Sequence, residues 1–233
     1  MEKSIKTILF LHDVLGVSKD LSALMDLMEE QNYKSFSFNF AGHGPSTKSP
    51  EEFRIDLFAC ELDMYIKNHN LKNVIVFGYS MGGYVALYHK ANFEDSPISQ
   101  IITYGTKFNW SEKAVSRELP MLDPDHLKVK FPSYTDSLQN KHGDKWKFLL
   151  KSTAHLMQNL EKLDGLTKED LLSIDIPVTL ILGDQDRMVS SEETHLNASW
   201  IPRAQVKTLT NSKHEMERSN LKELSEIIAQ VIN

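Results

Sequence analysis

A short apolar run leads into a helix through a serine flanked by glycines. The run 73–77 is followed by Gly78–Gly83, which reads Gly-Tyr-Ser-Met-Gly-Gly, and then by the helix-forming segment 84–89. A Gly-x-Ser-x-Gly turn between a strand and a helix is so tight that only glycine fits two residues either side of the serine. The serine hydroxyl is then exposed at the carboxyl end of the strand. The segment therefore predicts a nucleophile elbow with Ser80 as the nucleophile.

Strand-like and helix-like segments alternate around this turn over the first hundred residues. Continuous apolar runs are typical of strands buried on both faces of a parallel sheet, and apolar residues at helical spacing mark the segments between them. The predicted strands are 7–11, 35–40, 73–77 and 98–104, and the predicted helices are 19–31, 51–68 and 84–89. Repeated units of this length predict an α/β fold with a mostly parallel central sheet flanked by helices.

The alternation stops at residue 106 and resumes after residue 174. The stretch between them holds no strand-like run and is predicted to form several helices broken by proline and glycine, the clearest over 144–163. Beyond it we predict strands at 178–182 and 206–209 and helices at 190–200 and 220–232. We therefore divide the chain into an α/β core, residues 1–105 and 175–233, and a helical lid or cap insertion, residues 106–174.

Charge and composition exclude several classes of protein. The net charge is −6 over 233 residues, and the 26 Lys and Arg are dispersed among acids, which argues against a nucleic-acid surface. No run approaches the roughly 18 apolar residues that span a bilayer, and the first residues lack a signal-peptide core, so we expect a cytoplasmic protein. The single cysteine, Cys60, excludes an internal disulfide framework and is expected to be a small buried residue of its helix.

Two loops downstream of the elbow carry the partners that a serine nucleophile needs. The strand at 178–182 ends in an acidic loop with Asp184 and Asp186, and the strand at 206–209 ends in a loop with His214. All strands of a parallel sheet end on the same side, so we expect these groups to meet Ser80 at one crevice. A histidine must take the serine proton, and a carboxylate must hold the histidine. The chain order Ser, Asp, His predicts a catalytic triad.

With these motifs the chain resembles the α/β-hydrolase superfamily over nearly its whole length. The resemblance rests on the elbow, the Gly-x-x-Asp loop at 183–186, the late His214 and the Gly-His-Gly-Pro-Ser segment at 42–46. The family pattern places the acid three residues after the glycine, which implies Asp186 rather than Asp184. Ser80, Asp186 and His214 are therefore the predicted catalytic residues.

The resemblance also implies an oxyanion hole made by the backbone N–H groups of Val14 and Met81. The Met81 N–H lies at the start of a helix, where it can bind developing negative charge. Relatives usually carry His-Gly-x-x-Gly after the first strand, whereas this chain has His-Asp-Val-Leu-Gly at 12–16. Backbone donors do not depend on side-chain identity, so the predicted hole survives the substitution of the first glycine by Asp13 if the carboxylate turns outward.

Two residues depart from the family's pattern. A carboxylate at position 13 would weaken catalysis if it faced the oxyanion, and we expect Asp13 to turn outward and pair with a cation such as Arg187 or Lys19. Lys213 stands before His214, where relatives often have glycine, and this bears on the geometry of the loop.

The other histidines are predicted to have supporting roles. His43 is expected to be a structural loop residue hydrogen-bonded near the site, and His12 ends the first strand beside the crevice. His195 lies in a predicted helix, too close to Asp186 in sequence to follow the last strand. The remaining histidines show no spacing that indicates a metal site: His69, His89, His126, His142 and His155. No metal and no cofactor are predicted.

The apolar residues of the predicted lid suit the roof of a nonpolar pocket. The predicted substrate-binding residues are Phe108, Trp110, Trp146 and Met188. The Lys and Arg of the lid do not cluster enough along the sequence to indicate an anionic substrate.

The predicted function is a serine hydrolase that acts through an acyl-enzyme intermediate, by default a carboxylesterase on small to medium apolar esters. Its partner is a small-molecule ester, with no nucleic acid or membrane, and the protein is a monomer or a homodimer. The resemblance leaves open a C–C bond hydrolase or lyase with the same triad and an incidental haloperoxidase-like activity. A non-catalytic ligand-binding protein of the same fold is also open.

Overall fold

A six-stranded parallel sheet forms the centre of the protein, in the order β2-β1-β3-β4-β5-β6. The computed structural model describes residues 5–46, 52–162 and 165–233. The strands are β1 (Thr7–Leu11), β2 (Lys34–Ser37), β3 (Val74–Tyr79), β4 (Ile98–Tyr104), β5 (Val178–Gly183) and β6 (Ala204–Leu209). Leu11 of β1 pairs with Gly78 of β3, so the loop after β1 begins beside the elbow. The predicted fold class is confirmed, and β2 ends three residues before its predicted limit.

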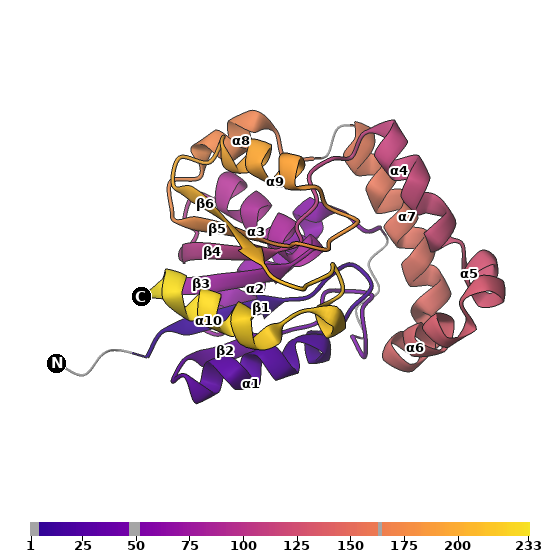
Figure 1. The fold of residues 1–233 in the computed structure, drawn as a ribbon, viewed down its shortest axis with the longest axis horizontal. Helices are drawn as coiled ribbons and strands as arrows, with labels where there is room; N and C mark the ends of the chain where they lie inside the picture. The colour runs from indigo at the N-terminus through magenta and orange to yellow at the C-terminus, as the bar shows by residue number, and fades with distance from the viewer. Residues whose placement is uncertain (1–4, 47–51, 163–164) are drawn as a thin grey trace.

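Helices cover both faces of the sheet (Figure 1). One face carries α1 (Ser22–Glu30), which follows the 3-10 turn η1 (Ser18–Leu21), and α10 (Leu221–Ile232), which follows the turn η4 (Met216–Arg218). The other face carries α2 (Ile55–Asn68), α3 (Met81–Asn92), α8 (Lys168–Ser173) and α9 (Ser191–Ala198). The central strands β3 and β5 are continuous apolar runs, and both are buried throughout. Burial of this apolar surface between the two helical layers stabilises the fold. The predicted start of the α2 helix at Glu51 lies outside the described residues.

The prediction for Cys60 is wrong, because its side chain is exposed to solvent. The stripe of α2 that packs on the sheet consists of Ile55, Phe58, Ala59, Leu62 and Ile66. Cys60 follows this stripe by one residue, which turns it about 100° around the helix axis toward the outer face.

Four helices between β4 and β5 form a separate layer beyond the carboxyl ends of the strands (Figure 1). They are α4 (Glu112–Glu118), α5 (Pro124–Lys130), α6 (Pro132–His142) and α7 (Trp146–Lys162), with the 3-10 turns η2 (Leu119–Leu122) and η3 (Gly143–Lys145) between them. We call this layer the helical insertion. It has its own apolar core, which includes Trp146, Leu150 and Met157 of α7. Leu149, Leu156 and Leu160 of the same helix pack with the main core instead, so α7 joins the two layers.

The division of the chain into a core and a lid stays a prediction, and two of its details can be placed. The helix α8, which the predicted boundary assigns to the insertion, packs against α3 of the core. The predicted end of the α7 helix at Leu163 lies outside the described residues. Among the helices that the structure describes, none has both the length and the apolar character needed to cross a membrane.

Candidate active site

Ser80 occupies the turn between β3 and α3 with a strained backbone. Its φ of 50° and ψ of −111° lie in a region that non-glycine residues rarely adopt, at a cost of roughly 1–3 kcal/mol. A Cβ at Gly78 would lie 2.3 Å from the nitrogen of Gly83, and one at Gly82 would lie 2.4 Å from the carbonyl oxygen of Leu11. These approaches explain why glycine is required two residues either side of the serine. The strand, turn and helix of the predicted elbow are therefore present.

Neighbouring strands hold the elbow in this conformation. The Ser80 N–H donates to the carbonyl of Tyr104 at 2.8 Å, and the Thr106 hydroxyl donates to the Ser80 carbonyl at 3.0 Å. Two anchors on the β4 side thus fix the backbone on which the serine hydroxyl is mounted.

His214 and Asp186 form a close pair at the carboxyl ends of β6 and β5. The Nδ1 of His214 lies 2.8 Å from Oδ2 of Asp186, whose side chain is fully buried. The other carboxylate oxygen, Oδ1, accepts the N–H groups of Met188 and Val189 at 2.7 and 2.9 Å. Because the carboxylate accepts a hydrogen bond from Nδ1–H, the Nε2 atom of a neutral His214 is left as a proton acceptor.

Asp184 has a different position from Asp186. Its carboxylate accepts the N–H of Ser212 at 3.0 Å and so ties the loop after β5 to the loop after β6. Of the two acids that the sequence offered, the fold brings Asp186 to the histidine and uses Asp184 in the loop behind it.

Tyr104 holds the loop that carries His214 in place. The Tyr104 hydroxyl contacts the carbonyl of Lys213 and lies 2.6 Å from the hydroxyl of Ser219. The left-handed backbone of this loop falls on Asn211, with φ of 50°, and not on Lys213. Lysine is therefore tolerated where relatives often have glycine.

One cavity joins the nucleophile to the histidine. Its size is about 60 Å³, and both Ser80 and His214 line it. Its other lining residues are Val14, Ile55, Met81, Tyr84, Lys107, Trp110, Leu156, Met157, Leu160 and Met188. We call it the catalytic pocket. Its walls are apolar apart from the reactive groups, Tyr84 and Lys107.

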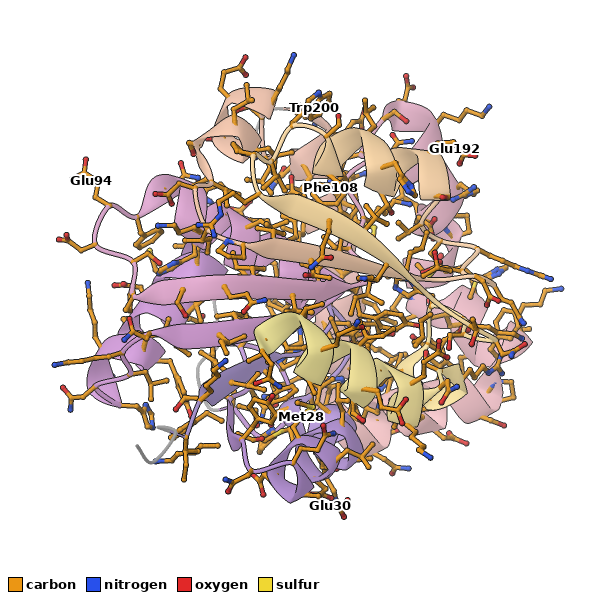
Figure 2. All side chains as sticks on the ribbon, turned by 60° about the vertical axis from the view of Figure 1, so that its left-hand side comes forward. Met28, Glu30, Glu94, Phe108, Glu192 and Trp200 are labelled. Carbon is orange, nitrogen blue, oxygen red and sulfur yellow. The ribbon has the colours of Figure 1, made fainter. Side chains whose placement is uncertain are left out.

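Two of the four predicted substrate-binding residues, Trp110 and Met188, line the catalytic pocket, and two do not. Trp146 faces the core of the helical insertion and is only 6% exposed. Phe108, labelled in Figure 2, packs against the main core, with 6.1 Å between its ring centroid and that of Tyr84. Because each of these rings packs within its own layer, neither borders the pocket, and their role in substrate binding stays a prediction.

The pocket residues that sequence reasoning missed come from three helices and from the loop after β4. Ile55 lies on α2, Tyr84 on α3, and Leu156 and Leu160 on α7. Helical spacing of 156 and 160 was the available signal, because residues four apart share one face of a helix. The most informative omission is the basic residue Lys107.

Both predicted oxyanion donors border the same pocket. Val14 and Met81 line it, and Met81 is the first residue of α3, where a helix leaves its N–H groups without intrahelical partners. Within the described part of the chain, no backbone or side-chain acceptor takes the N–H of either residue. His43 fixes the loop, because its Nε2 lies 2.8 Å from the Val14 carbonyl.

The prediction for Asp13 is wrong in its partner. Among the described residues Asp13 forms no ion pair with Arg187 or Lys19, and Asp20 pairs with Lys141 at 2.9 Å. The carboxylate of Asp13 folds back over Gly16, where a Cβ would come within 1.9 Å of Oδ1. Burial and the nearby Asp20 carboxylate raise the pKa of Asp13 to about 6. The nearby Lys141 ammonium lowers the pKa of Asp13 but does not offset the effect of burial.

Three buried histidines surround this loop. The ring of His12 lies 4.9 Å from that of His43, and the ring of His142, from α6, lies 6.1 Å from that of His43. Burial lowers the pKa of His12 and His142 and brings that of His43 to about 4. Each ring is bonded to main-chain atoms, and His142 joins the helical insertion to Gly44 and Leu15. These uncharged rings hold the loop in place through hydrogen bonds, which is the structural role predicted for His43. The sequence did not indicate that His142 joins them.

The parallel sheet covered by helices on both faces, with a helical insertion after β4, is the fold of the α/β-hydrolases. The family model described as serine aminopeptidase, S33, matches residues 2–219, and the chain belongs to this hydrolase family.

Individual relatives are distant. The chain is similar to the AB hydrolase superfamily protein YisY of Bacillus subtilis, with 18% identity over 98% of this chain and 92% of that protein. A putative esterase/lipase 2 of Mycoplasma genitalium is 31% identical over 80 residues, 34% of this chain and 30% of that one. Among solved structures, NosK of Streptomyces actuosus superposes with a TM-score of 0.81 at 17% identity, over 98% of this chain and 97% of its own. At that identity the likeness concerns the fold.

Proposed function

We propose that the protein is a serine hydrolase that cleaves small carboxylic esters with the triad Ser80, His214 and Asp186. The observation that carries the proposal is the 2.8 Å contact between His214 and Asp186 beside a pocket that Ser80 also lines. A buried carboxylate on Nδ1 fixes the tautomer in which Nε2 can accept the serine proton. Membership of a hydrolase family and the partial similarity to a protein named as an esterase support the same chemistry.

The reaction runs in two halves. His214 Nε2 takes the proton of Ser80 as its Oγ attacks the ester carbonyl carbon, and the N–H groups of Val14 and Met81 stabilise the oxyanion. The C–O bond to the alcohol breaks as His214 returns the proton to the leaving oxygen. Water then attacks the acyl-serine with the same proton transfers, so the acid and Ser80 are released.

The pocket size favours short acyl chains. A cavity of about 60 Å³ corresponds to on the order of four to six water molecules. Its apolar wall of Trp110, Leu156 and Leu160 suits hydrocarbon, and its limited volume excludes a long chain.

A series of p-nitrophenyl esters from acetate to dodecanoate tests the proposal. We expect kcat/KM to peak at short to medium acyl chains and the Ser80→Ala protein to lose activity on all of them. Full activity of Ser80→Ala would contradict the triad, and a clear preference for long-chain triglycerides would contradict the predicted substrate class.

A further inference from the structure

Lys107 is a cation built into the wall of the catalytic pocket. It follows β4 by three residues, is 7% exposed, and lines the pocket together with Ser80 and His214. A buried ammonium group is costly unless it is paired and hydrogen-bonded. A positive charge beside a nucleophile in an apolar pocket therefore calls for a counter-charge.

The protein supplies that counter-charge only in part. The Nζ atom of Lys107 lies 3.4 Å from Oε1 of Glu118 and 3.4 Å from the carbonyl of Met188, and both contacts are long. Glu118 is shared with Arg117 at 3.2 Å. An ammonium group has three protons to donate, and within the described residues no third oxygen or nitrogen acceptor faces Nζ, whose remaining neighbour is the face of the Trp110 ring.

A second groove meets the catalytic pocket at Lys107 and Met188, which line both. The fold gathers four cations along it, from the insertion and from the loops after β4 and β5: Lys107, Lys113, Arg117 and Arg187.

The two acids of this groove are already occupied by protein donors. Asp186 bonds to His214, Met188 and Val189, and Glu193 accepts the N–H groups of Phe108 and Asn109 at 2.5 and 2.6 Å. The acids of this groove are therefore held by protein donors, whereas Lys113 and Arg187 form no ion pair among the described residues.

We propose that Lys107 makes the catalytic pocket selective for short esters that carry a carboxylate a few bonds from the scissile carbonyl. The ligand carboxylate takes the free donor of Nζ, while the hydrocarbon between the two groups lies against Trp110, whose ring centroid is 5.8 Å from Nζ. The basic groove draws such an anion toward the pocket. This inference rests on the proposed function and names its substrate class. It departs from the expectation that the Lys and Arg of the lid do not indicate an anionic substrate, because these cations line one groove only in the fold.

Two esters of nearly the same shape test the proposal, monomethyl glutarate and methyl 5-methylhexanoate, which end in a carboxylate and in an isopropyl group. Acid release is followed by titration at constant pH. In the wild-type protein we expect kcat/KM for monomethyl glutarate to exceed that for the neutral ester at least tenfold. The ratio should fall at least tenfold in Lys107→Met and should be kept in Lys151→Met, an exposed lysine of α7 outside the groove. Equal ratios in wild type and Lys107→Met, or a wild-type preference for the neutral ester, would overturn the proposal.

Calorimetric binding to the Ser80→Ala protein separates this inference from the proposed function, because it needs no turnover. We expect monomethyl glutarate to bind Ser80→Ala at least tenfold more tightly than the Ser80→Ala/Lys107→Met double variant. Equal binding overturns the anion site even if the enzyme hydrolyses esters. Tight binding without hydrolysis by the wild type would keep the site and refute the esterase. If Lys107→Met does not fold, Lys107→Gln replaces it. The preference of the wild-type protein between the two esters also tests the proposal without any variant.

Discussion

The strand-end loops and the helical insertion approach the catalytic pocket from opposite sides and are built on different principles. The loops carry the proposed catalytic groups on a rigid sheet, where Ser80, Asp186 and His214 follow β3, β5 and β6. Short hydrogen bonds join His214 to Asp186 and the Ser80 N–H to the Tyr104 carbonyl. The insertion contributes the apolar wall through α7, and its own core is small and separate. In the proposed function, the sheet side fixes the chemistry and the insertion side shapes the pocket that binds the substrate.

The largest effect is expected on the sheet side, at Asp186. Asp186→Asn keeps the shape of the side chain and lets the amide stabilise the wrong tautomer of His214, so we expect kcat for ester hydrolysis to fall about 10⁴-fold. Steady-state kinetics measures this, with circular dichroism as a check on folding. Asp184→Asn is the matched control, because Asp184 holds the loop and not the histidine. An equal loss in both variants would contradict the assignment.

A truncation in the core of the insertion should loosen that layer alone. Leu150 is fully buried among residues of α4 to α7, and Leu150→Ala is expected to cost about 2–5 kcal/mol. Hydrogen exchange should speed up in α4–α7 and stay slow in β1 and β3. Leu9→Ala, an equally buried position in β1, is the control and should weaken protection across the sheet. If Leu150→Ala weakened both layers equally, the insertion would not be a separate unit.

Asp13, in the loop after β1, makes the stability of the protein depend on pH. Its pKa is raised from an ordinary value near 3.8 to about 6, so between these values the folded protein holds a proton that the unfolded chain has lost. The free energy of unfolding therefore falls as pH rises through this window, by about 2–3 kcal/mol in total. Asp13→Asn removes this loss and should be the more stable protein at pH 8, while the two converge near pH 4. Urea unfolding at both pH values measures the difference, and a constant difference would refute the raised pKa.

The smallest effect concerns the length of the acyl chain. Trp110→Ala removes part of the pocket wall and enlarges the pocket without touching the triad. The preferred p-nitrophenyl ester should therefore become longer by at least two carbons, with hydrolysis rates changed severalfold. Trp200, labelled in Figure 2, packs against the main core and does not line the pocket, so Trp200→Ala is the control and should keep the wild-type preference. An unchanged optimum in Trp110→Ala would mean that this wall does not limit the substrate.

The same difference explains what the sequence could predict. The strands are continuous apolar runs buried on both faces, and parallel pairing brings their ends together whatever the intervening helices do. The meeting of Ser80, Asp186 and His214 thus follows from order along the chain.

For the helical insertion, no comparable rule predicts from the sequence which residues meet. On α7, Trp146 and Leu156 are both apolar and both buried, and only packing decides which stripe faces the pocket. Local periodicity also misplaced Cys60 by one position around its helix. The pKa of Asp13 and the partners of Lys107 depend on which charges lie near them in space. No spacing along the chain carries that information.

Covalent labelling of Ser80 tests the central claim most directly. A fluorophosphonate reacts only with a serine whose proton is taken by a base, so wild-type protein should gain one adduct on the peptide that contains Ser80. Labelling should be absent in Ser80→Ala and strongly slowed in His214→Ala. A wild-type protein that gains no adduct, or gains it on another serine, would contradict the account.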